Sequence, residues 1–137
     1  MPRNERAPDA GRQWAGTIAA NVRHHRRVRD LHQRDVADRM TLLGYPWTQR
    51  TVSDAERHNR DLTFDEVAAL AIVLGVTPVD LLDPRGFQPS ERPDLPFIGL
   101  GNVTVEQAAE WLAGTRTIAL VQQDDGKLRL RNERGTT

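Results

Sequence analysis

Residues 31–57, LHQRDVADRMTLLGYPWTQRTVSDAER, decide how this chain folds. They predict one helix, a turn that contains Gly44 and Pro46, and a second short helix that Thr48 opens. The apolar residues on one face of the first helix are Val36, Ala37 and Met40. Those on the inner face of the second helix are Val52 and Ala55. The pattern indicates two short helices that pack on a shared core.

The first turns of the second helix carry polar side chains, which are Gln49, Arg50, Thr51 and Ser53. Two short helices joined by a tight turn form the unit that lays a recognition helix in the major groove of DNA. Amide, guanidinium and hydroxyl groups at the start of such a helix read base edges. Arg50 suits guanine and Gln49 suits adenine, and a solvated or phosphate-binding side chain is the alternative for Arg50.

The composition favours a soluble globular protein. The chain has 137 residues, of which 38% are hydrophobic and 28% are charged, and it contains no cysteine. Disulfides, thiol nucleophiles and thiolate metal sites are therefore excluded. No apolar run is long enough to span a bilayer, and the polar N-terminal residues do not resemble a secretory signal. We expect a cytoplasmic, nucleoid-associated location and no membrane partner.

Charge is balanced overall but unevenly distributed. Lys and Arg number 19, as do Asp and Glu, so the net charge is zero, which argues against a protein that coats nucleic acid nonspecifically. Residues 21–34 hold five arginines and three histidines against one aspartate. A solvated basic helix face is one interpretation. Beside the paired helices, a phosphate-facing role is favoured, and Arg23 and Arg27 are its candidates.

Apolar spacing and capping residues predict an all-α fold, with five helices in an orthogonal bundle over residues 13–83. The first three helices are expected at 13–29, 33–43 and 49–57. Thr63 and Glu66 form a capping box at the start of the fourth helix, which Gly75 ends. Thr77 caps a short fifth helix with proline at its first position.

The remaining sequence predicts three segments around this bundle. Residues 1–12 read as a flexible basic arm, and residues 84–96 as a proline-rich linker. Residues 97–137 predict a small unit with a helix from the Thr104 capping box to Gly114, followed by a β-hairpin around Asp124-Asp125-Gly126. A lone hairpin is marginal in water, so this unit needs its helix, the bundle or a partner chain to pack against.

We expect neither an enzyme nor a metal, cofactor or small-molecule site. Metal-ligand spacing with a carboxylate partner is lacking among the histidines, which are His24, His25, His32 and His58. The two aspartates before Gly126 are more typical of a turn than of a general acid/base pair. The sequence contains no nucleophile–base arrangement and no glycine-rich loop for phosphate.

The segment from Ile18 to Leu82 resembles the lambda repressor-like helix-turn-helix family, also called the XRE or Cro-type family, and looks most like its actinobacterial branch. The matching elements are Leu31-His32-Gln33, Val36-Ala37, Thr51 to Glu56, Leu70-Ala71, Leu74-Gly75-Val76 and Leu81-Leu82. The resemblance covers about half of the chain. Their order and spacing carry the resemblance, and no single element does so alone.

The resemblance implies roles for individual residues. Base-contacting positions would be Thr48, Gln49, Arg50 and Ser53. Phosphate-contacting positions would be Gln33, Thr51, Asn59 and Arg60, beside Arg23 and Arg27. Arg26 and Glu56 would form a structural ion pair that holds the recognition helix against the first helix.

The chain departs from the family pattern at four points. His32 replaces the usual Ser, Thr or Asn cap, and His58 stands where a glycine is usual, which would require a strained or altered turn. The segment between Met40 and Thr48 is longer than in the tight phage-repressor turn. Asp54 would repel phosphate if it faced DNA, although it could accept a hydrogen bond from cytosine N4.

Two functions follow as hypotheses. The first is a sequence-specific double-stranded DNA-binding transcriptional regulator, a repressor of chromosomal or prophage type, acting as a homodimer on an inverted repeat. The second is an antitoxin or protein-interaction adaptor on the same fold. Dimerisation would use the fifth helix or residues 97–137, where its candidate residues are Trp111, Leu112 and Ile118.

Overall fold

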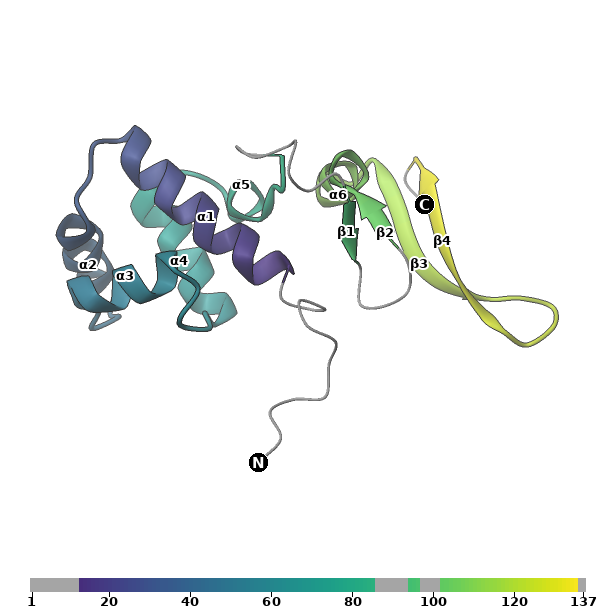
Figure 1. Cartoon of the computed structure of the whole chain (residues 1–137), viewed down its shortest axis with the longest axis horizontal. Coiled ribbons are helices and arrows are strands. Elements are labelled where there is room, and N and C mark those ends of the chain that lie inside the picture. The colour runs from purple at the N-terminus through teal and green to yellow at the C-terminus, as the bar shows by residue number, and fades with distance from the viewer. Residues whose placement is uncertain (1–12, 86–93, 97–101, 136–137) are drawn as a thin grey trace, which may run out of the picture. The chain divides into compact units, whose positions relative to one another are not determined.

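The structure is a computed structural model, and it describes residues 13–85, 94–96 and 102–135 (Figure 1). The described residues are mostly helical, with six helices and two small antiparallel sheets. The chain divides into two compact units, of which one is Trp14–Asp83 and the other contains the residues from Pro84 onward. The expected arm at residues 1–12 and most of the expected linker lie outside the described residues.

The first unit consists of five helices, α1 to α5. Their bounds are Gln13–Val28 for α1, Gln33–Leu42 for α2, Gln49–Glu56 for α3, Phe64–Leu74 for α4 and Pro78–Leu82 for α5. Each expected helix is present, and its ends lie close to the expected ones. Among these described residues, no helix is both long and apolar enough to cross a membrane.

Threonine caps and left-handed glycines set the helix ends. The hydroxyls of Thr48, Thr63 and Thr77 each accept a hydrogen bond from the backbone N–H three residues on, so each satisfies a donor that the helix leaves unpaired. Gly44 and Gly75 follow the last turns of α2 and α4 with φ of 98° and 71°. Other residues adopt this conformation at a cost, so the two glycines end their helices cleanly.

One apolar core joins the five helices. Its largest fully buried side chains are Val22, Val36, Met40, Val52, Leu70, Leu74 and Leu81. Asn21 is a buried polar exception, because its amide N–H groups donate to the carbonyl oxygens of Leu81 and Asp83 at 2.8 and 2.9 Å. These bonds attach the end of α5 to α1 and satisfy carbonyls that would otherwise be costly to bury.

The second unit contains β1 (Asp94–Pro96), β2 (Asn102–Thr104), α6 (Val105–Leu112), β3 (Arg116–Gln122) and β4 (Leu128–Arg134). The expected α6 and the β3–β4 hairpin are both present, with Gly126 in the turn at φ 82°. The pairing of β1 with β2 was not expected, because residues 84–96 were assigned wholly to a linker. The all-α class is therefore corrected to mainly α with two small sheets.

Polar contacts attach α6 to the base of the hairpin. The Glu110 carboxylate accepts one hydrogen bond from Arg116 at 2.8 Å and pairs with Arg134 at 3.2 Å. Asn132 donates to Gln107 on the same helix at 3.1 Å. The hydrogen bond from Arg116, helped by the charge of Arg134, keeps the pKa of Glu110 below its ordinary value. The base of the hairpin is thus supported by a helix, in contrast to its tip.

Candidate nucleic-acid interface

The turn between α2 and α3 fixes where α3 begins. The Tyr45 N–H donates to the Met40 carbonyl at 3.0 Å, which closes the end of α2. Trp47 then turns inward and is buried in the core. Thr48 follows directly as the cap of α3. The start of α3 is therefore anchored by an aromatic side chain one residue before it.

Thr48 and Thr51 cap α3 reciprocally. The Thr51 N–H donates to the Thr48 hydroxyl at 3.3 Å, and the Thr48 N–H donates to the Thr51 hydroxyl at 3.2 Å. This arrangement is a capping box with threonine where glutamate or glutamine is usual. The family resemblance implied that these residues contact a base and a phosphate, and in the structure both hydroxyls accept a hydrogen bond at the helix start.

Beyond this cap, α3 presents Gln49 and Arg50 to solvent, and Ser53 is half-buried. The Arg50 side chain is 83% exposed. Asp54 lies one turn further on, 3.6 Å from Arg50 and 3.5 Å from Arg57. The acid that was expected to repel phosphate is therefore flanked by two arginines. Sequence spacing could have identified the trio, since positions four and three apart on a helix are neighbours.

The far end of α3 is held by Glu56, whose side chain is only 2% exposed. Arg26 of α1 donates to its two carboxylate oxygens at 2.6 and 3.0 Å, which is the ion pair that the family resemblance implied. A third hydrogen bond comes from the Gln33 amide at 3.1 Å. The bond to Glu56 raises the pKa of Arg26. Helices α1, α2 and α3 therefore meet at one buried carboxylate, which we call the Glu56 cluster.

Gln33 was expected to contact phosphate, and it begins α2 in the structure. One N–H of its amide is directed to Glu56. A primary amide carries two N–H groups, so a second donor remains available for a ligand. The residue can thus brace α3 and contact an anion at the same time.

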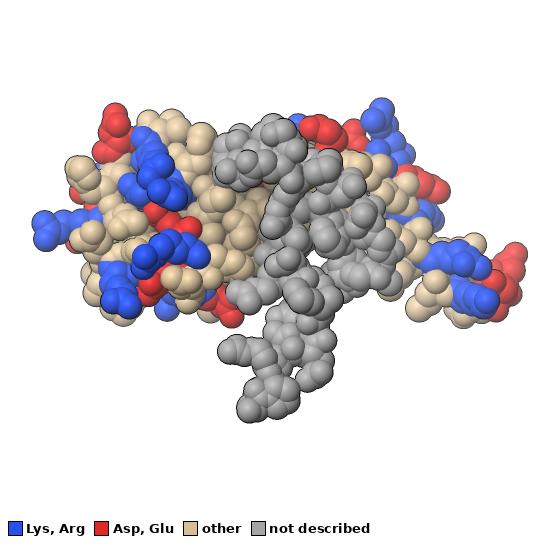
Figure 2. Space-filling view, in the orientation of Figure 1, with Lys and Arg blue, Asp and Glu red and all other residues tan. Residues whose placement is uncertain are grey.

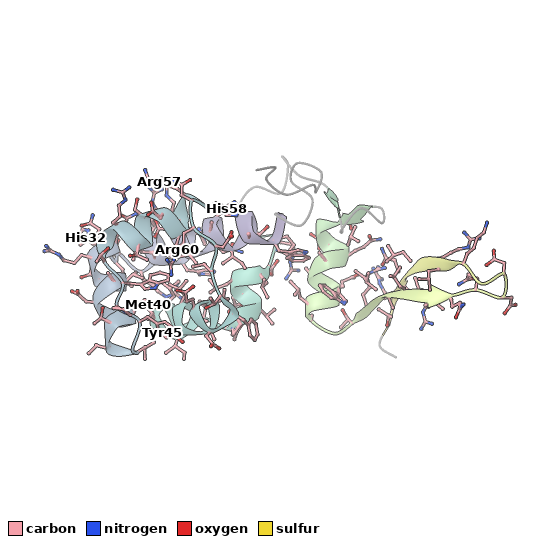
Figure 3. All side chains as sticks on the ribbon, turned by 90° about the horizontal axis from the view of Figure 1, so that it is seen from below. His32, Met40, Tyr45, Arg57, His58 and Arg60 are labelled. Atoms are coloured by element: carbon pink, nitrogen blue, oxygen red, sulfur yellow. The ribbon has the colours of Figure 1, made fainter. Side chains whose placement is uncertain are left out.

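Arg60 was expected to contact phosphate, and in the structure it has partners within the bundle. Its guanidinium pairs with Glu66 of α4 and lies 5.2 Å from the centre of the Trp47 ring. Trp47 also donates to Glu66 at 3.3 Å. Figure 3 shows Arg57 extending outward at the edge of the bundle and Arg60 lying back across it. Arg60 therefore fastens the loop after α3 to α4.

Glu66 is the second buried carboxylate of the bundle. Burial by itself would raise the pKa of this carboxyl. Hydrogen bonds from the Thr63 N–H, Arg60 and Trp47 outweigh the burial, so the pKa lies below its ordinary value of 4.5. From the sequence, Glu66 was expected only to take part in a capping box with Thr63. Its contacts with Arg60 and Trp47 require the loop and the turn to meet, which no local spacing indicates.

The loop after α3 contains the expected strained residue. His58 has φ of 59°, a left-handed conformation that residues other than glycine rarely adopt. Its Nε2 is buried with no hydrogen-bond partner in the described ranges, and its ring lies near Gly16 of α1. Asn59 is exposed, and its N–H donates to the Asp54 carbonyl at 2.8 Å. Asn59 therefore remains accessible to a ligand at the end of α3.

The basic residues of α1 are partly accessible. Arg23 and Arg27 are exposed. The pKa of His25 is lowered by burial and by the neighbouring charges of His24 and Arg29. Figure 2 shows Lys and Arg side chains interspersed with Asp and Glu on the visible face of this unit. Such a surface favours recognition through a few placed side chains over binding through a uniformly basic face.

Comparison with known proteins adds no further information. No protein-family model matches this chain, and a search of curated proteins found no match.

Proposed function

We propose that this chain is a sequence-specific double-stranded DNA-binding protein of the XRE helix-turn-helix type, which inserts α3 in the major groove and regulates transcription as a repressor. The observation that carries the proposal is the combination of an exposed Gln49–Arg50 pair and a rigidly held α3. The helix is fastened by the Thr48 cap at its start and the Glu56 cluster at its end.

Rigid placement matters because base recognition depends on geometry. A bidentate arginine–guanine contact requires both N–H groups to meet O6 and N7 together. The Glu56 cluster restricts rotation of α3 about its own axis, and the buried Val52 and Ala55 fix the face that it turns to the core. Gln49 and Arg50 are then presented from a fixed platform.

Asp54 limits nonspecific binding without preventing specific binding. The exposed pair between Arg50 and Asp54 is worth about 0.2–1 kcal/mol in water. A good bidentate arginine–guanine contact contributes about 1–3 kcal/mol of discrimination. Arg50 therefore gains free energy when it leaves Asp54 for guanine. It gains little when it leaves Asp54 for a loose phosphate contact. The acid thus favours the correct base over random DNA.

Phosphate contacts would position α3 along the groove. The accessible candidates are Gln33, Asn59, Arg23 and Arg27, with Arg57 added by its exposed position beside Asp54. Arg60 is not included because it is committed to Glu66. Each phosphate contact by a cation steepens the dependence of affinity on salt, so these arginines can be counted by titration with salt.

Selection of bound duplexes from a random DNA pool at about 0.15 M salt tests the proposal. The wild type is compared with Gln49→Ala/Arg50→Ala, and with Gln123→Ala/Arg129→Ala as a control that removes the same residue types from the hairpin. We expect the wild type and the control to enrich the same site, and the α3 variant to enrich none. Identical pools from all three proteins, or no enrichment by the wild type, would rule the proposal out.

Protein binding is the second candidate function, and large apolar side chains on the bundle surface favour it. Leu42 is 85% exposed, Phe64 78% and Ile72 68%. Single exposed apolar residues are ordinary, but several on a small unit favour a protein partner. If the chain is an antitoxin, that partner is its toxin. Under this function, substitution of Gln49 and Arg50 would leave partner binding unchanged.

A further inference from the structure

The β3–β4 hairpin leaves one edge of β4 without a paired strand. The sheet has two strands, and among the described residues β4 pairs with β3 alone. The Gln123 N–H donates to the Lys127 carbonyl at 2.8 Å, so position 127 directs its backbone groups toward β3. In an antiparallel pair such positions alternate with positions whose backbone groups point away. The N–H and C=O groups of Leu128, Leu130 and Asn132 therefore point to the open edge.

The two faces beside this edge differ chemically, because successive side chains of a strand point to opposite faces. Leu128 and Leu130 lie on one face, and Leu128 is 63% exposed. Arg129 and Arg131 lie on the other face, where the residues opposite them on β3 are uncharged. The edge is accessible toward the tip of the hairpin, since α6 contacts β3 and reaches β4 at its base (Figure 1).

The charge of the two strands is mostly positive. Together β3 and β4 contain four arginines and one glutamate. Arg129 lies 3.2 Å from Asp125, and Arg131 lies 3.4 Å from Glu133. The two arginine side chains are still 58% and 40% exposed. Exposed ion pairs of this kind are weak, so a carboxylate from a partner can replace either acid.

We propose that the open edge of β4 binds an extended acidic segment of a partner protein, which adds a third strand to the hairpin. Strand addition supplies partners for the backbone groups of the edge, and alternate side chains select the sequence. Apolar side chains of the added strand lie beside Leu128 and Leu130, and its carboxylates lie beside Arg129 and Arg131. A sheet of three strands with an apolar face is also more stable than a lone hairpin.

The same features disfavour two other partners. A second copy of this chain along the edge would bring its own Arg129 and Arg131 beside those of the first, and like charges on neighbouring strands are destabilising. Duplex DNA would engage the arginines but would leave the leucines and the backbone groups without partners. A strand that alternates acidic and apolar residues matches all three features. This binding does not involve α3, so it goes beyond the proposed function and can hold or fail independently of it.

Fluorescence anisotropy of a labelled peptide, titrated with the full chain, tests the proposal. The peptide has about six residues, the usual length of a strand, in which glutamate alternates with leucine. In the control peptide, lysine replaces glutamate. We expect the glutamate peptide to bind with a dissociation constant of about 10–500 µM and the lysine peptide at least about tenfold more weakly. Equal binding of the two peptides, or no binding of the glutamate peptide up to about 1 mM protein, would overturn the proposal.

A proline at position 130 tests the backbone contact. Leu130→Pro removes an N–H that points to the open edge and spares the hydrogen bonds to β3, which is the arrangement in which an edge strand accepts proline. Leu130→Ala is the matched control, because it loses the same side chain and retains the N–H. We expect Leu130→Pro to bind the glutamate peptide about fivefold more weakly than Leu130→Ala. Equal affinities of the two variants would overturn strand addition.

Charge reversal separates lost recognition from lost folding. Arg129→Glu/Arg131→Glu should prefer the lysine peptide over the glutamate peptide, since opposite charges again lie side by side. A misfolded hairpin would lose both peptides and would not exchange its preference. A reversed variant that still prefers the glutamate peptide would overturn the proposal. So would a variant whose peptide binding is unchanged while its affinity for duplex DNA falls, because the arginines would then be phosphate contacts.

Discussion

Removal of Arg26 should be among the most damaging single substitutions in the bundle. The change is Arg26→Met, which retains much of the aliphatic length and removes the charge. It leaves Glu56, a carboxylate with a 2% exposed side chain, with the Gln33 amide as its one remaining side-chain donor in the described residues. It also removes the hydrogen bond from Arg26 to the Leu31 carbonyl at 2.9 Å.

The magnitude follows from the desolvated charge. Breaking a buried ion pair by removing one partner costs about 3–5 kcal/mol, since the remaining charge is left uncompensated. The hydrogen bond to Leu31 adds about 1 kcal/mol. Domains of this kind are stabilised by about 5–15 kcal/mol in total, so the variant should lose a large part of its stability.

Urea unfolding followed by circular dichroism at neutral pH measures this loss. The double variant Arg26→Met/Glu56→Leu is the matched control, because it removes both charges. It should recover most of the stability, since apolar residues often replace a buried pair at little cost. If Arg26→Met costs less than about 1 kcal/mol, or if the double variant is as unstable as the single one, the Glu56 cluster does not hold α3 as argued.

Three further substitutions test the fold. Glu66→Gln should weaken the dependence of the unfolding free energy on pH in the acid range, which urea midpoints at a series of pH values would record. The pKa of Glu66 is lowered in the folded state, so the stabilisation by its carboxylate is complete above the ordinary pKa of 4.5. That stabilisation is lost as pH falls through the folded pKa. Gly75→Ala should destabilise the fold by about 1 kcal/mol because φ is 71°, whereas Gly16→Ala inside α1 should be neutral or stabilising. If both variants lowered the thermal unfolding midpoint, the conformational argument would be contradicted. Thr48→Ala should cost about 1 kcal/mol by removing the α3 cap, and an unchanged urea midpoint would show that the cap contributes nothing.

Helix positions could be predicted because their signals are local. Thr63 and Glu66 lie three residues apart and satisfy each other's backbone donors, so the start of α4 is encoded in four residues. Gly75 marks its end for an equally local reason, since glycine adopts positive φ without strain. Apolar spacing identified the buried faces between these ends.

Contacts between distant segments were harder to predict. The pairing of Arg26 with Glu56 was implied only by resemblance to a family, because thirty positions separate the residues. The capture of Arg60 by Glu66 and Trp47 was missed, since it depends on how the turn before α3 and the loop after it approach each other. One residue expected to contact phosphate therefore also forms an ion pair within the bundle.

Short strands were the other gap. The β3–β4 hairpin was predicted from alternation around Asp-Gly, whereas β1 and β2 contain three residues each and show no alternation that a sequence could reveal. Their pairing depends on backbone hydrogen bonds between segments that carry no distinctive side chains. The position of Leu120 opposite Leu130 likewise follows only from the register of β3 and β4.

Insertion of α3 in the major groove is the central claim, and methylation interference on the selected duplex tests it most directly. Guanine N7 lies in the major groove and adenine N3 in the minor groove, so methylation at each reports on a different groove. We predict that N7 methylation within each half-site blocks binding by the wild type, and that Arg50→Ala loses this sensitivity at one guanine per half-site. Interference from adenine N3 alone, or a pattern that Arg50→Ala leaves unchanged, would contradict recognition by α3.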